Sequence, residues 1–76
     1  MTKESTSKRG TSDVPFDLVS TLYHALQGAD TYEQYMTDAE KAGDRELAQF
    51  FWDNKEENRH RAERAKQLLV KHLSGA

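Results

Sequence analysis

Two acidic residues and one histidine could do chemistry in this sequence. Glu57 and His60 stand three residues apart, which places a carboxylate and an imidazole close together on a helix surface. Carboxylate and imidazole groups are both suitable ligands for iron. Glu33 could join them at a site shared between subunits of an oligomer. These three residues define a metal hypothesis, in which iron is handled at an inter-subunit site.

The surroundings of Glu57 and His60 favour a solvated surface over a metal site. In helical projection His60 points almost directly away from the apolar stripe, and Glu57 points to one flank among charged residues. His24 and His72 have no spacing that converges with His60 in one chain. Because a Glu and a His three residues apart are common on charge-rich helices, we favour no metal, no cofactor and no catalytic residue.

Glu33 also belongs to a predicted polar core layer with Asn54, Asn58 and Arg61. In projection these side chains lie within or at the edge of the apolar stripes, and folding the chain about Gly43 brings Glu33 level with Asn54. A buried carboxylate needs a partner, so we expect Glu33 to pair with Arg61 or with an asparagine amide, in its own chain or another. Since amides are poor ligands for transition metals, we favour a layer that fixes register and oligomeric state.

Two amphipathic helices must position these residues. Apolar residues recur at spacings of three and four, which predicts helices over about 16–42 and 44–73 joined at Gly43. Pro15 suits the first turn of the first helix, with Asp13 or Ser12 as its cap, and Asp44 can cap the second. The expected central stripes are Val19, Leu22, Leu26, Ala29 and Met36 in the first helix and Leu47, Phe51, Ala62, Ala65 and Leu69 in the second. The short turn makes the helices antiparallel neighbours within a domain of residues 13–74, and residues 1–12 are expected to form a flexible tail.

Phe50, Phe51 and Trp52 are the strongest sign of self-association. Consecutive helical residues point about 100° apart, so three adjacent aromatic side chains cannot all face one neighbouring helix. A lone hairpin would leave one or more of them in water. We therefore expect these three residues to form an oligomer interface.

The composition excludes several classes of function. The chain has 76 residues and no cysteine, so a small core cannot be supplemented by disulfides or thiolate metal sites. Its formal net charge of −2 provides no bulk attraction to nucleic acid or anionic lipid. No apolar run is long enough for a membrane span or for a secretion signal. We expect a cytoplasmic protein without nucleic-acid or membrane partners.

Several features together resemble the first helical hairpin of the ferritin-like superfamily, especially rubrerythrins and small encapsulated ferritins. The resemblance spans about residues 22–69 and is carried by Tyr32, residues 39–43, Leu47-Ala48, Phe51 and Glu57-x-x-His60. It implies a di-iron site built from a first-helix Glu seven residues before the tyrosine and a Glu-x-x-His on the second helix. Aligned without a gap, these ligand stations fall on Ala25, Asn58 and Arg61, while Glu57 and His60 come one residue early. The resemblance therefore implies a hairpin whose metal stations hold non-ligands, with Glu33 and Arg61 compensating charge in place of the metal.

These observations predict an all-α, antiparallel two-helix hairpin that assembles into a four-helix bundle as a homodimer or higher oligomer. The favoured function is a non-catalytic, self-associating structural or interaction module. The alternative is a ferritin-like protein that binds iron between subunits, which anaerobic Fe(II) titration would reveal. A third reading is an adaptor that docks an unknown partner protein on Tyr23, Tyr35 and Trp52.

Overall fold

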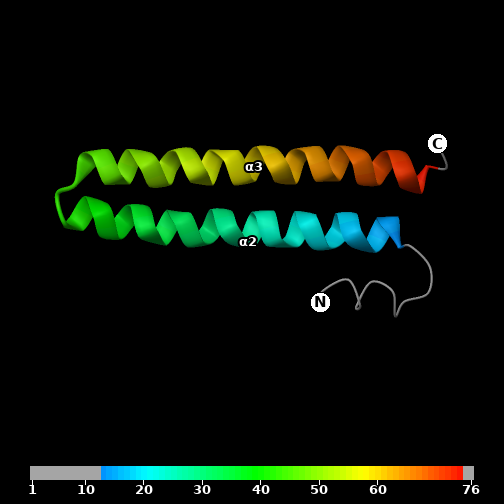
Figure 1. The fold of residues 1–76 in the computed structure, drawn as a ribbon, viewed down its shortest axis with the longest axis horizontal. Helices are drawn as coiled ribbons and strands as arrows, with labels where there is room; N and C mark the ends of the chain where they lie inside the picture. The colour runs from blue at the N-terminus through cyan, green and yellow to red at the C-terminus, as the bar shows by residue number, and fades with distance from the viewer. Residues whose placement is uncertain (1–12, 75–76) are drawn as a thin grey trace, which may run out of the picture.

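The computed structural model describes residues 13–74, and the predicted tail of residues 1–12 lies outside them. Helix α2 spans Val14–Lys41 and helix α3 spans Arg45–Leu73. The two helices lie side by side and run in opposite directions (Figure 1). No strand occurs in the described part of the chain. The fold confirms the predicted all-α hairpin.

Both helices begin at an aspartate cap. The Oδ1 atom of Asp13 accepts a hydrogen bond from the Phe16 N–H at 3.1 Å, and Oδ1 of Asp44 accepts one from the Leu47 N–H at 3.0 Å. Pro15 lies in the first turn of α2, where its missing N–H would have no intrahelical partner. The helix can therefore start at Val14, two residues before the predicted position.

The turn between the helices is closed by backbone hydrogen bonds. Gly43 has a φ of 76°, a conformation that favours glycine. Its N–H donates to the Glu40 carbonyl at 3.0 Å, and the Asp44 N–H donates to the Ala39 carbonyl at 3.0 Å. This pair of bonds is the Schellman arrangement, which satisfies carbonyls that the end of α2 would otherwise leave free.

Replacing Asp44 with alanine should lower the free energy of unfolding by about 1 kcal/mol, because the first turn of α3 loses its cap. Urea denaturation followed by circular dichroism measures this change. Asp44→Asn is the matched control, since asparagine caps about as well as aspartate and should retain most of the stability. A loss just as large in Asp44→Asn would assign the effect to charge and not to capping.

The contact between the helices is made of alanine. The buried residues are Ala25, Ala29 and Ala39 on α2 and Ala48, Ala62 and Ala65 on α3. Val19, Leu26 and Leu47, expected in the central stripes, are instead 40–49% exposed. The predicted stripe residues Ala29, Ala62 and Ala65 are buried, so α3 has the predicted orientation while α2 is turned toward Ala25. Small side chains at the contact allow the backbones to approach, and larger ones move to the flanks. In the described residues, neither helix combines the length and apolar character needed to cross a membrane.

Candidate functional site

The hairpin has two broad faces, one on each side of the alanine contact. On each helix, residues at alternating spacings of three and four form one row toward each face, the spacing typical of packed helices. We call the first the tyrosine face; its rows are Leu18, Thr21, Ala25, Gly28, Tyr32, Tyr35, Ala39 and Ala42 on α2 and Leu47, Phe51, Asn54, Asn58, Arg61, Ala65, Leu68 and His72 on α3. We call the second the tryptophan face; its rows are Val19, Leu22, Leu26, Ala29, Glu33, Met36 and Glu40 on α2 and Ala48, Trp52, Lys55, Arg59, Ala62, Lys66, Leu69 and Leu73 on α3.

An aromatic cluster lies near the turn on the tyrosine face. The ring of Phe51 has its centroid 5.4 Å from that of Tyr35 and 6.1 Å from that of Tyr32. Phe51 and Tyr35 also line a hollow of about 390 Å³ with Ala39 and Leu47, which we call the aromatic hollow. Its walls are almost entirely apolar, so water in it has few hydrogen-bond partners.

A second apolar hollow lies toward the open end of the same face. It has a volume of about 520 Å³ and a floor formed by Leu18, Thr21, Ala65 and Leu68, and we call it the leucine hollow. Its rim is polar and includes Arg61. The tyrosine face therefore carries two separate apolar depressions, one at each end.

Asparagines occupy the middle of the tyrosine face, between the two hollows. Asn58 lies directly over Gly28, so that a Cβ atom on Gly28 would be 2.8 Å from Nδ2 of Asn58. Nη1 of Arg61 donates a hydrogen bond to Oδ1 of Asn58. Nδ2 of Asn54 donates to the Phe50 carbonyl at 2.9 Å. Three members of the predicted polar layer thus lie together at the centre of this face.

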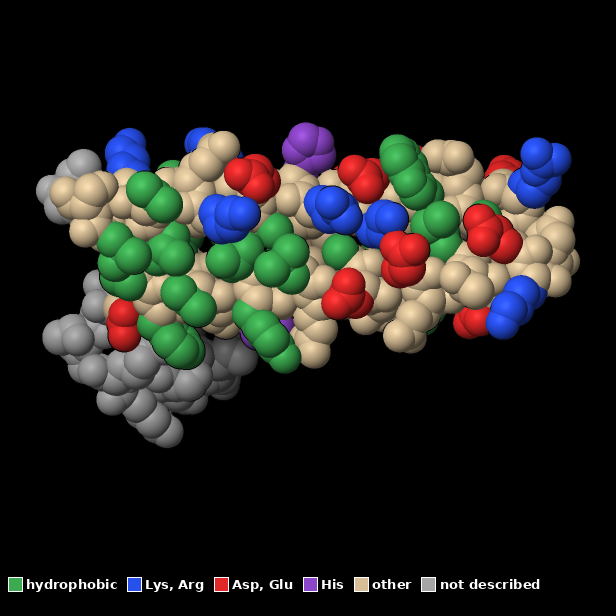
Figure 2. Space-filling view, turned by 180° about the vertical axis from the view of Figure 1, so that it is seen from behind, with side chains coloured by type: hydrophobic (Ala, Val, Ile, Leu, Met, Phe, Trp, Pro, Cys, Tyr) green, Lys and Arg blue, Asp and Glu red, His purple; other side chains and the backbone are tan. Residues whose placement is uncertain are grey.

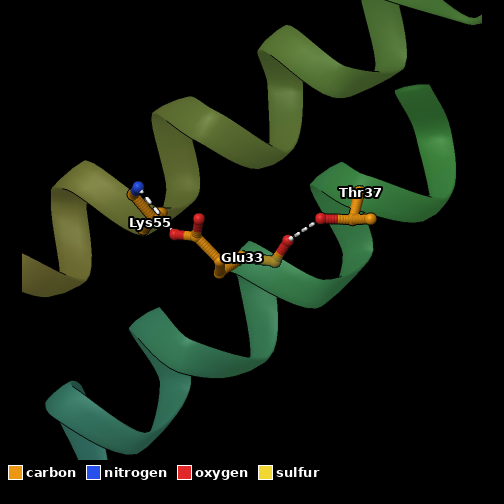
Figure 3. Close-up of polar contacts among 3 residues, drawn as sticks. All are labelled: Glu33, Thr37 and Lys55. Atoms are coloured by element: carbon orange, nitrogen blue, oxygen red, sulfur yellow. Dashed lines mark hydrogen bonds and ion pairs between the residues drawn. The ribbon is translucent and has the colours of Figure 1, made fainter. Parts of the chain in front are cut away.

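Glu33, the fourth member, lies on the opposite face. Its Oε1 atom is 2.9 Å from Nζ of Lys55, and its backbone carbonyl accepts a hydrogen bond from Oγ1 of Thr37 (Figure 3). The predicted partners, Arg61 or an asparagine, are therefore wrong for the isolated hairpin, because the rotation of α2 turns Glu33 away from them. The Glu33 side chain is 61% exposed, so the ion pair contributes little to stability.

Lys55 was missed by the reasoning from sequence. Its side chain is only 15% exposed, because the aliphatic stem runs along the contact between the helices while the ammonium group reaches Glu33. The sequence did contain one sign that Lys55 is partly buried, because Lys55 lies seven residues before Ala62 in the same row of α3.

The tryptophan face is mixed in character. Figure 2 views the hairpin from this side and shows hydrophobic side chains gathered toward the open end, with a band of charged side chains across the middle. Among its rows are five charged residues, namely Glu33, Glu40, Lys55, Arg59 and Lys66. The same rows also hold four exposed large hydrophobic side chains, Val19, Leu26, Trp52 and Leu73.

The aromatic triplet is divided between the faces. Phe51 packs against Tyr32 and Tyr35, whereas Phe50 is 57% exposed and Trp52 is 42% exposed. This confirms that a single hairpin leaves part of the triplet in water. Trp52 lines a depression with Met36 and Ala48 on the tryptophan face, so one flat interface cannot cover all three aromatic residues.

The three residues of the metal hypothesis do not meet within one hairpin. Glu57 and His60 both line the rim of the leucine hollow, beside Arg61 and Arg64. Glu33 lies on the other face, paired with Lys55. Within residues 13–74 no group of three histidine, aspartate or glutamate side chains is placed to hold a metal ion.

The chain matched no protein-family model, no curated protein and no solved structure. The ferritin-like relationship therefore stays a prediction. Its three ligand stations, Ala25, Asn58 and Arg61, belong to the rows of the tyrosine face.

Proposed function

We propose that this chain is a self-associating structural module, in which two hairpins pack into a four-helix bundle. One observation carries the proposal: the residues buried in the hairpin are all alanine, while large apolar side chains lie outside. Among the described residues, eleven large hydrophobic side chains are at least 37% exposed. Such a distribution is typical of a helix pair whose core is completed by another surface.

The energetics of a small chain support the same conclusion. Burial contributes about 25 cal/mol per Å² of apolar surface, and an alanine side chain offers little of it. A domain of this size usually needs stabilisation beyond its own core, and the chain has no cysteine for a disulfide. A second copy would supply the missing apolar contact without any further component.

Sedimentation equilibrium at micromolar concentration tests this function. We expect a mass of at least twice the 8.7 kDa of one chain. The midpoint of thermal unfolding should also rise with protein concentration, because association stabilises the folded state by mass action. A monomeric mass together with a concentration-independent midpoint would contradict the proposal.

A further inference from the structure

We infer that two hairpins pack through their tyrosine faces in antiparallel orientation, with the Gly28–Asn58 contact of each copy at a two-fold axis. The inference rests on the proposed self-association and specifies its surface and its symmetry. In such an isologous interface, a residue on one side of the axis contacts the residue at the same distance on the other side.

The α3 row supports this symmetry by the sizes of its residues. Phe51 lies seven residues before Asn58 and Ala65 lies seven residues after it. The axis therefore sets the large Phe51 ring against Ala65 of the partner subunit. In the same way Leu47 meets Leu68 of the partner subunit, since they lie eleven and ten residues from Asn58.

The α2 row shows the same pairing of large with small residues. Tyr35 and Thr21 are each seven residues from Gly28, so Tyr35 lies against Thr21 of the partner subunit. Tyr32 likewise lies near the partner's Ala25. At the axis Gly28 and the Asn58 side chain that fills the space beside it face their own symmetry copies.

Each of the two hollows lies where this arrangement places large side chains of the partner subunit. The aromatic hollow is centred about 15 Å from the Gly28–Asn58 contact, and the floor of the leucine hollow about 13 Å on the other side, given a rise of 1.5 Å per residue. The aromatic hollow can therefore receive Leu18 and Leu68 of the partner subunit, while the leucine hollow receives the partner's Tyr35. Interdigitation of this kind approaches the packing density of a protein core.

Charge favours the tyrosine face over the tryptophan face. Arg61 is the one residue with a formal charge at neutral pH in the two rows of the tyrosine face, against five in the rows of the tryptophan face. Asp38, Glu57 and Arg64 are further charged residues at the edges of the two hollows. In the antiparallel register Arg61 lies level with Asn54 of the partner subunit, whose carbonyl oxygen can accept a hydrogen bond. The five charged residues stay in water.

A parallel dimer through the same face packs less well. It would set α2 over the partner's α3 at the same level, and so place Tyr35 against Phe51 of the partner subunit and Thr21 against the partner's Ala65. Large would meet large at one end and small would meet small at the other, which produces a clash and a void.

The area of the face is sufficient for a stable dimer. Helices of 28 and 29 residues present a surface of about 42 by 20 Å, or about 800 Å² per partner, at 1.5 Å per residue and a helix diameter near 10 Å. A standard stable interface buries about that area on each side.

Electron–electron distance measurement on a spin label at position 71 tests the orientation. Lys71 is exposed, and the full chain has no cysteine, so Lys71→Cys takes a single label. Thirteen residues separate position 71 from Asn58, so the labels of an antiparallel dimer should lie about 40 Å apart. A dimeric mass with labels about 20 Å apart would overturn the inference and leave self-association standing, whereas a monomeric mass would overturn both.

A pair of charge variants tests which face is used. Leu47→Glu places a carboxylate on the tyrosine face in the first turn of α3, where the helix dipole tolerates it, and Leu26→Glu is the matched change on the tryptophan face. We expect Leu47→Glu to raise the dimer dissociation constant by about tenfold or more, and Leu26→Glu to change it by less than about threefold. The reverse order would assign the interface to the tryptophan face and overturn the inference. Circular dichroism confirms that both variants are helical.

Discussion

Phe51→Ala should reduce the free energy of unfolding by about 3 kcal/mol, because the chain loses a ring that contacts three neighbouring aromatic rings. Phe51 contacts Tyr32, Tyr35 and Phe50, with ring centroids 5.4 to 6.1 Å apart. Because a chain of this size holds only about 3–5 kcal/mol in total, the variant should be largely unfolded at 37 °C. Urea denaturation of the wild type and the variant, followed by circular dichroism, measures the difference.

The two neighbours of Phe51 provide matched controls. Phe50→Ala removes the same ring from a position that is 57% exposed and should cost less than about 1 kcal/mol. Trp52→Ala removes a still larger ring from the tryptophan face, and it should leave the mass in solution unchanged if the tyrosine face is the interface. Equal losses in all three variants would show that the packing of Phe51 has no special role.

Ala62→Leu should destabilise the hairpin by about 1–3 kcal/mol, although leucine is more hydrophobic and nearly as good a helix former. Ala62 is one of the most deeply buried residues and lies where the helices approach closely. Three added carbon atoms would force the helices apart and open gaps around the neighbouring alanines. For a domain of this size, a loss of 1 kcal/mol lowers the melting temperature by about 4–8 °C.

Gln67→Leu is the control for Ala62→Leu, because it adds a leucine to an exposed position of the same helix. We expect a change within about 0.5 kcal/mol for this surface substitution. Scanning calorimetry of both variants at one concentration compares them directly. A more stable Ala62→Leu protein would show that the helices can separate without cost, and that alanine does not set their distance.

Local features of the fold follow directly from the sequence. Asp13, Pro15, Gly43 and Asp44 determine where the helices begin and where the chain turns, because capping and positive φ depend on residues within a few positions. The division of Phe50, Phe51 and Trp52 also follows from helical geometry alone.

The pairing of Glu33 could not be derived in this way. The helical period places Glu33 in the same row as Ala29 and Met36. It does not determine how far that row is turned from the neighbouring helix. A rotation of α2 by less than one residue moved Glu33 to the tryptophan face and gave it Lys55 as its partner. The same rotation separated Glu33 from Asn54, Asn58 and Arg61.

The sequence by itself therefore determined two amphipathic helices, their caps, their turn and the exposure of part of the aromatic triplet. Only the tertiary structure decided which side of α2 meets α3. The physical reason is that close approach of two backbones favours alanine at the contact, whereas a pattern of hydrophobicity gives most weight to the large side chains. Six of the eleven exposed large side chains lie in the rows of the two faces, and the proposed association would bury Tyr35 and Leu47 among them.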